Sequence, residues 1–232
     1  MANAVLRGDL RARGTSRKIR VVVLVYLGML ALLLLLGLPP ELNQVGLSGG
    51  LELALLGVQV VLVTYFASAC ALQEIAVEGE RPAADLACGP FSRRTIVIGK
   101  SVASLATVTY WLLLGLPMLV LVSEIRQSPL ASLALVFALV AVQAWAVAQI
   151  GMLYSIVFES EFTRTLAHWA TLLAIFVATL ALPPEMQWTN PVVAVARAAQ
   201  GAIPVEAVAC YAALGLGCGG LAYGALRRFG TT

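Results

Sequence analysis

Residues Leu130–Phe158 read LASLALVFALVAVQAWAVAQIGMLYSIVF, a run without a single Asp, Glu, Lys or Arg. A helix needs about 20 mostly apolar residues to cross the hydrocarbon layer of a bilayer. This run is long enough to cross with some tilt, and it lacks the alternation of polar and apolar residues expected of a transmembrane β-strand. It therefore predicts a helix that spans a membrane.

Five further apolar runs fill much of the remaining chain. The composition agrees with a membrane protein, because 60% of the residues are apolar and 12% are charged, whereas soluble domains have about 25% charged residues. We therefore predict an all-α, polytopic membrane protein with one domain over residues 1–232. The six predicted spans are Val21–Leu38, Leu51–Leu72, Ile96–Val122, Leu130–Phe158, Thr165–Leu182 and Val205–Leu226.

Lys and Arg residues are strongly biased to one side of these spans. With six spans both termini share a side, and that side collects thirteen of the fifteen basic residues, leaving Arg126 and Arg197 opposite. The positive-inside rule then places both termini in the cytoplasm. Residues 1–20 are expected to form a basic segment at the inner leaflet. Pro39-Pro40 follows the first run where a signal peptide would have a small-residue cleavage site, so we interpret that run as a span.

The segment 73–100 is the main charged stretch between spans, and it lies on the predicted cytoplasmic side. Pro82–Cys88 predicts a short elbow helix at the membrane surface, which Gly89-Pro90 would end; an ordinary charged loop is the alternative. Ser92 is placed to cap the following helix. The charged residues of the segment are Glu74, Glu78, Glu80, Arg81, Asp85, Arg93, Arg94 and Lys100.

Two patterns that suggest catalysis fail on inspection. Gly46-Leu47-Ser48-Gly49 matches a protease box, but Ser48 and His168 are predicted at opposite membrane surfaces, roughly 30 Å apart, and cannot meet. Gly99-Lys100-Ser101 lacks the first glycine of a phosphate-binding loop, because Arg94 stands there. The chain also lacks a pattern of His and Cys residues typical of metal sites. We therefore expect no catalytic site, no metal and no cofactor in this chain.

The stretch Pro90-Phe91-Ser92-Arg93-Arg94-Thr95-Ile96-Val97-Ile98-Gly99-Lys100 resembles the P-x-S-R-x-x-I-x-x-G-K segment of ABC type-2 transporter permeases. The resemblance extends to the six-span outline and to the acidic stretch before this segment. It departs from the family at Arg81–Asp85, where a more aliphatic run is usual. The resemblance implies the plasma (inner) membrane of a bacterium, a second permease copy or a paralogous permease, and a cytosolic ABC ATPase that carries the ATP and Mg. It implies no nucleic-acid partner.

The same resemblance assigns residues to ATPase coupling. The second cytoplasmic loop is a candidate second contact through Glu159, Glu161 and Arg164, and a solvated turn is the alternative. A scaffold or sensor that docks a cytosolic partner without transport is the alternative function. The expected coupling residues are Glu74, Glu78, Glu80, Arg81, Asp85, Pro90, Ser92, Arg93, Arg94 and Lys100.

Two regions bear on the substrate path. Residues 183–204 predict an external amphipathic segment. Its lipid-facing residues would be Trp188, Val192, Val193 and Val195, and its outward-facing residues would be Gln187, Asn190 and Arg197. Uncharged polar residues within spans can line a path or bond neighbouring helices. They are Gln59, Thr64, Tyr65, Gln143, Gln149 and Tyr154. The absence of a charge near mid-membrane favours a hydrophobic substrate.

Overall fold

The computed structural model describes residues 17–37, 49–73, 92–126 and 129–229, and these residues form helices without strands. The predicted elbow helix and most of the basic N-terminal segment lie outside the described residues. The elements are α2 (Arg17–Gly37), α3 (Gly49–Gln73), α5 (Arg93–Arg126), α6 (Leu130–Val157), α7 (Glu161–Phe176), the 3₁₀ helices η2 (Ala178–Ala181) and η3 (Gln187–Thr189), α8 (Pro191–Ala199) and α9 (Val205–Phe229).

Five of these helical stretches are long and apolar enough to cross a membrane, which confirms the all-α, membrane-type prediction at that level. The stretch in α7 runs on through η2, from Glu161 to Ala181. In α2 the apolar stretch among the described side chains, Val23–Leu32, is shorter than a span. The spans that meet the criteria are Leu53–Leu72, Arg94–Leu121, Leu130–Val157, Glu161–Ala181 and Val205–Arg227.

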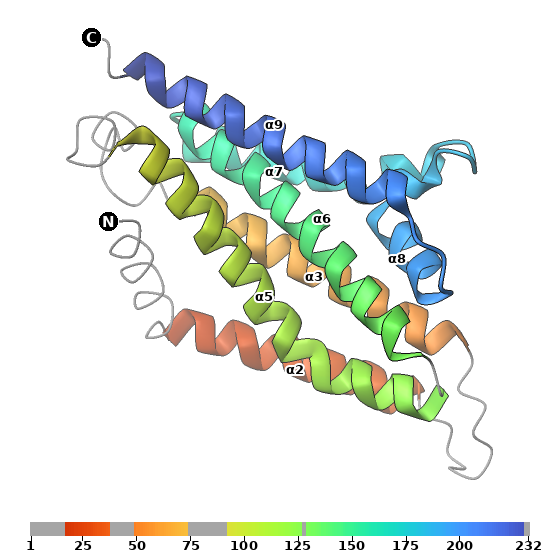
Figure 1. Ribbon diagram of the computed structural model, residues 1–232. Helices are drawn as coiled ribbons and strands as arrows, with labels where there is room; N and C mark the ends of the chain where they lie inside the picture. The colour runs from red at the N-terminus through yellow and green to blue at the C-terminus, as the bar shows by residue number, and fades with distance from the viewer. Residues whose placement is uncertain (1–16, 38–48, 74–91, 127–128, 230–232) are drawn as a thin grey trace.

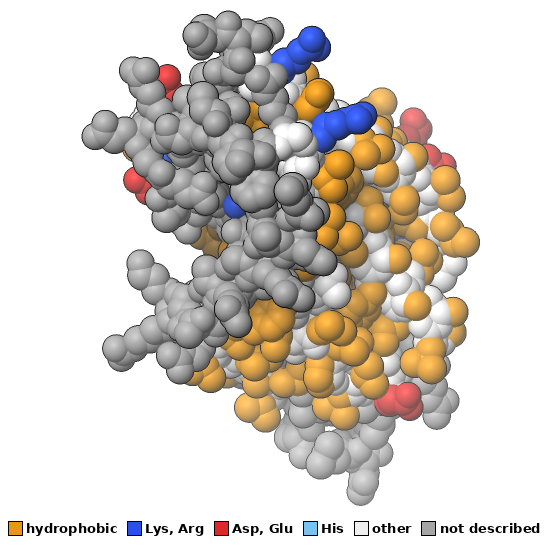
Figure 2. Space-filling view, turned by 60° about the vertical axis from the view of Figure 1, so that its left-hand side comes forward, with side chains coloured by type: hydrophobic (Ala, Val, Ile, Leu, Met, Phe, Trp, Pro, Cys, Tyr) orange, Lys and Arg blue, Asp and Glu red, His pale blue; other side chains and the backbone are white. Residues whose placement is uncertain are grey.

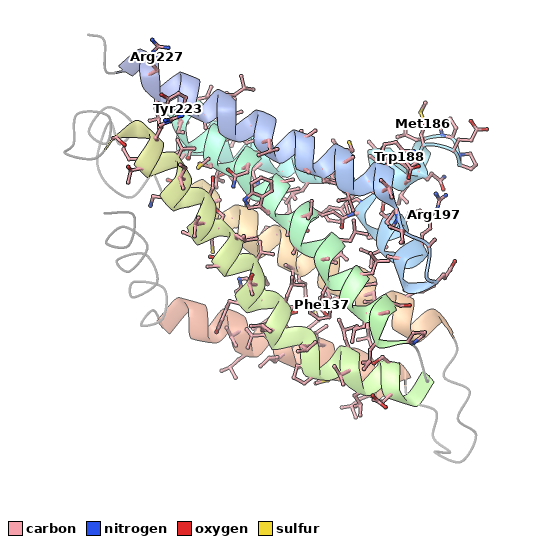
Figure 3. All side chains as sticks on the ribbon, viewed as in Figure 1. Phe137, Met186, Trp188, Arg197, Tyr223 and Arg227 are labelled. Carbon is pink, nitrogen blue, oxygen red and sulfur yellow. The ribbon has the colours of Figure 1, made fainter. Side chains whose placement is uncertain are left out.

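The long helices run back and forth between the two ends of an elongated bundle (Figure 1). One end holds the start of α5, the end of α6 and the end of α9, where Ile96, Ile156 and Leu226 pack together. The opposite end holds α8, with Arg197, Met186 and Trp188 nearby, whereas Arg227 lies at the first end (Figure 3). We call the first end the α9-end, because α9 ends there, and the opposite end the α8-end, because α8 lies there.

Helix α6 occupies the interior of the bundle, where it contacts α3, α5, α7, α8 and α9. Its sequence is apolar around the whole circumference, the pattern of a helix that is enclosed by others. Small residues allow close contact: a Cβ added to Gly151 would lie 2.8 Å from the backbone oxygen of Ser68 in α3. Close helix approach at small residues is typical of helix packing in membranes.

The outer helices expose large apolar side chains, as expected of surfaces that face lipid. Leu24, Leu113 and Leu216 are examples, and the outward face of α7 adds Leu173. Figure 2 shows one such face, on which apolar side chains form a broad surface and charged side chains lie toward its two ends. A water-soluble protein would rarely expose so large an apolar area.

Helix α8 is packed into the bundle, and this corrects two predictions for the 183–204 segment. Val195 is fully buried in the core rather than facing lipid. Asn190 is also fully buried rather than facing outward, because it caps α8 by accepting from the backbone N–H groups of Val192 and Val193. Pro191 occupies the first turn, where its missing N–H costs nothing. The hydroxyl of Tyr211 in α9 donates to the Thr189 carbonyl oxygen at 2.6 Å, which fixes the segment from the other side.

Candidate functional site

The predicted ATPase-coupling residues are described only in part, because Glu74, Glu78, Glu80, Arg81, Asp85 and Pro90 lie outside the described residues. Ser92 is described, and it caps α5 as predicted. Its hydroxyl oxygen accepts from the Thr95 backbone N–H at 3.3 Å and lies 2.7 Å from the Thr95 hydroxyl. This arrangement satisfies an N–H group that would otherwise lack a partner at the start of the helix.

The basic residues that follow Ser92 do not form one exposed surface. Arg93 is the first residue of α5, and the Arg94 side chain is exposed. Lys100, two turns further along, is only 3% exposed and lies within the protein. Arg94 is therefore accessible to a partner at the α9-end, whereas Lys100 is not.

The candidate second contact also combines exposed and buried residues. Glu159 and Glu161 are exposed in and after the turn that joins α6 to α7. Glu161 lies in the first turn of α7, where a carboxylate is favoured by the positive end of the helix dipole. Arg164 is buried, on the same face of α7 as His168 and Leu172. The turn lies at the α9-end, as does the start of α5 (Figure 1).

Buried polar side chains run through the interior of the bundle, between the two ends. On α3 they include Gln59, Thr64 and Ser68, and on α6 they include Gln143 and Gln149. Ser101 of α5 donates to Gln149 Oε1 at 2.9 Å, which links α5 to α6. All of these groups are uncharged at neutral pH.

Several atoms of this polar row have no hydrogen-bond partner among the described residues. They are Gln59 Nε2 and Oε1, Gln143 Nε2 and Oε1, Gln149 Nε2, Thr64 Oγ1 and Ser104 Oγ. An unmade hydrogen bond of a buried group costs about 1–3 kcal/mol. The packing of these side chains therefore carries an energetic cost that the apolar contacts around them must offset.

Ser68 and His168 form a hydroxyl–imidazole contact that the sequence did not suggest. The Ser68 hydroxyl donates to the Thr64 carbonyl oxygen at 2.6 Å, and His168 Nε2 lies 3.4 Å from Ser68 Oγ. The Ser68 hydroxyl oxygen also lies 3.1 Å from the Tyr65 carbonyl oxygen. Ser68 is fully buried, and its contact with His168 joins α3 to α7 inside the bundle.

The prediction for His168 itself needs a correction. The fifth predicted span begins at Thr165, but α7 begins at Glu161, so His168 lies in the second turn of the helix, where its side chain is 3% exposed. Ser48, its rejected partner, lies outside the described residues. Within the described ranges, no three His, Cys, Asp or Glu side chains are grouped so that they could hold a metal ion.

In comparisons with known proteins, no protein-family model matches the chain and no curated protein matches it.

Proposed function

We propose that this chain is the membrane-spanning permease subunit of an ABC exporter, whose separate ATPase subunit binds and hydrolyses ATP with Mg. The observation that carries the proposal is the Pro90–Lys100 segment, which resembles that of the permeases and in which Ser92 caps α5. In this proposal α2 supplies a sixth span. Its apolar part, Val21–Gly37, has 17 residues, about 26 Å at 1.5 Å per residue, which is at the lower limit of the length that spans the hydrocarbon layer.

The ATPase would dock at the α9-end, which the bias in Lys and Arg assigns to the cytoplasm. The segment 73–100 would enter a groove of the ATPase as a short helix, and its acidic residues would fix the register by charge complementarity. Exposed Arg94, Glu159 and Glu161 support this assignment, since they lie at the same end and are open to contact. Buried Lys100 and Arg164 would act indirectly, by holding the ends of α5 and α7.

Transport in this proposal uses the uncharged polar interior of the bundle. ATP-driven closure of the two ATPase subunits would tilt the helices between states that are open to opposite sides. The unpaired amides of Gln59 and Gln143 favour such a change, because opening would supply partners that the packed state lacks. A second permease copy, or a paralogous permease, would complete the assembly.

Charge reversal tests the docking assignment. The double variant Glu78→Arg/Glu80→Arg should bind the ATPase about tenfold or more weakly, since like charges would then face each other. The control is Glu185→Arg/Glu206→Arg, which reverses two exposed carboxylates in the segments around η3 and at the start of α9, at the α8-end. Both variants should elute from size-exclusion chromatography as the parent does. Intact ATPase binding by the Glu78/Glu80 variant would overturn the assignment.

A further inference from the structure

Tyr110 carries a hydroxyl group on the outer face of α5, close to the middle of the span Arg94–Leu121. Either end of that span is about 16 Å or more away along the helix axis, farther than a tyrosine side chain reaches. The side chain is 47% exposed. Its ring contacts Trp111, but its hydroxyl has no hydrogen-bond partner among the described residues. A single chain therefore leaves this hydroxyl among lipid tails, which offer it no partner.

This position is unusual for an exposed tyrosine of a membrane helix. Tyrosines are enriched where the lipid headgroups lie, with the ring in the apolar layer and the hydroxyl near water. Tyr223 follows that rule, since it is 38% exposed and lies beside Arg227 at the α9-end (Figure 3). The two tyrosines thus differ in depth, and Tyr110 is the one that lacks access to water.

The neighbouring Thr109 shows why the tyrosine needs an outside partner. Thr109 is also exposed, but its hydroxyl donates to the Leu105 carbonyl oxygen at 2.9 Å, within the same helix. Threonine side chains are short enough to bond preceding carbonyl groups in this way. The Tyr110 hydroxyl stands at the far end of an aromatic ring and cannot bend back to its own backbone. Its partner must therefore come from another molecule.

A second polar group on the same face of α5 also lacks its usual partner. Pro117 lies inside the helix and has no N–H, so the Leu113 carbonyl oxygen loses the donor that a regular helix supplies four residues later. Leu113 is 58% exposed, and Pro117 is exposed as well. Positions 110, 113 and 117 share one face of the helix. Backbone groups freed by proline in a membrane helix are commonly satisfied by neighbouring helices, hydroxyl side chains or ordered water, so this face favours a protein neighbour.

The same face allows close approach by another helix. One turn before Tyr110 lies Ala106, which is half-buried and carries only a methyl group. Membrane helices associate where small residues bring the backbones together and polar side chains bond across the contact. Helix α9 exposes small residues too, Gly217 and Gly220, but small residues alone do not mark a contact. The face of α5 combines a small residue with two unpaired polar groups near mid-membrane.

We propose that this face of α5 binds the same face of a second copy of the chain, with the two Tyr110 hydroxyls hydrogen-bonded to each other at a two-fold axis. In a two-fold contact the same surface is used by both copies, so a residue on the axis meets its own equivalent. A hydroxyl suits this place because it both donates and accepts. The inference rests on the proposed function, which requires a second permease; it makes that permease an identical copy and locates the contact.

Dilution of the chain in lipid tests the contact. The purified full-length chain is labelled in two batches with donor and acceptor fluorophores at the C-terminus, mixed, and reconstituted in liposomes at falling ratios of protein to lipid. Energy transfer then gives the dimer dissociation constant. Tyr110→Phe keeps the ring and removes the hydroxyl, and it should raise this constant about three- to tenfold, as expected for the loss of one hydrogen bond between membrane helices. Tyr223→Phe is the matched control and should leave the constant unchanged.

A second pair of variants locates the helix that forms the contact. Ala106→Leu adds bulk beside Tyr110 and should raise the dissociation constant tenfold or more, whereas Ala213→Leu, at an exposed position of α9, should not change it. The thermal unfolding midpoint of each variant shows whether it is folded. A chain that stays monomeric at every dilution would overturn the proposal. So would a dimer that is unaffected by Tyr110→Phe, or one that is weakened by Ala213→Leu and not by Ala106→Leu.

The measurement needs no ATPase, so the two proposals can fail separately. A dimer that depends on Tyr110, in a chain that never associates with an ATPase, would support the contact and contradict the exporter. Stoichiometric ATPase association by a chain that does not pair with itself would support the exporter and contradict this contact.

Discussion

The side-chain amide of Asn190 donates to the backbone carbonyl oxygen of Phe176 at 3.0 Å, and so joins the start of α8 to the end of α7. The same amide nitrogen lies 2.8 Å from the Thr179 hydroxyl oxygen in η2. The side-chain oxygen of Asn190, Oδ1, caps α8 by accepting from the Val192 backbone N–H. One buried residue therefore holds three elements together at the α8-end, where an apolar surrounding makes each of these bonds costly to leave unmade.

Substitution of Asn190 is expected to destabilise the α8-end. Asn190→Ala removes an N-cap, worth about 1 kcal/mol, and leaves the Phe176 carbonyl oxygen without this donor, so the free energy of unfolding should fall by about 2–3 kcal/mol. Asn190→Ser keeps a capping oxygen and should lose less. Thermal unfolding in detergent gives the order parent, Ser, Ala. An Ala variant as stable as the parent would contradict the role assigned to Asn190.

The close contact of α3 and α6 at Gly151 predicts a steric effect. A Cβ there would press on the backbone oxygen of Ser68, which cannot rotate away, so Gly151→Ala should lower the free energy of unfolding by about 1–3 kcal/mol. Gly217→Ala in α9 is the control, because a Cβ there meets nothing within 4 Å. It should be neutral or slightly stabilising, given the better helix propensity of Ala. Equal midpoints of thermal unfolding for the two variants would argue against close packing at Gly151.

For the hydrogen bond between Ser101 and Gln149, we expect the two single substitutions to lower the free energy of unfolding by unequal amounts. Ser101→Ala deprives Gln149 Oε1 of its donor and should cost about 0.5–1.5 kcal/mol. Gln149→Leu removes an amide whose Nε2 has no partner among the described residues, so it should cost little. The double variant should therefore be more stable than Ser101→Ala alone, measured by chemical or thermal unfolding. If Ser101→Ala costs nothing, the bond does not contribute to stability.

The bias in Lys and Arg predicts the membrane sidedness of the two ends. In a background without the four native cysteines, Ser160→Cys lies in the exposed turn at the α9-end, and Ala202→Cys lies in an exposed turn before α9 at the α8-end. A membrane-impermeant maleimide added to intact cells should label the second variant, and label the first only after permeabilisation. The reverse pattern would place the α9-end outside and remove the basis for cytoplasmic docking.

Five of the six predicted spans coincide with helices that are long and apolar enough to cross a membrane, but the sequence predicts their buried faces poorly, for a physical reason. The long apolar run of α6 predicts a spanning helix, and a serine before an apolar run predicts the cap that Ser92 forms on α5. Lipid, however, is as apolar as the protein interior, so an apolar helix carries little periodicity to mark its inward face. The outward placement predicted for Asn190 failed for another reason: its side chain caps α8 and donates to the Phe176 carbonyl oxygen, contacts that the amphipathic pattern does not indicate.

Contacts between segments that are far apart in the chain could not be predicted from the sequence either. Ser68 and His168 lie 100 residues apart, and the convergence of Gln59 and Tyr26 over Gly115 draws on three helices. A buried glutamine was visible in the sequence as an uncharged polar residue in a span. Whether its side chain pairs with a neighbour depends on the rotation of the helix about its axis. The pattern of residues in an apolar span does not determine that rotation.

Co-purification from the native membrane shows whether the chain works with an ATPase. The chain should be extracted gently from membranes of its own host, captured by affinity and analysed by mass spectrometry with an ATPase assay. We expect a stoichiometric P-loop ATPase partner and vanadate-sensitive ATP hydrolysis. A clean preparation without any ATPase, reproduced under milder extraction, would contradict the exporter and favour a membrane scaffold or sensor.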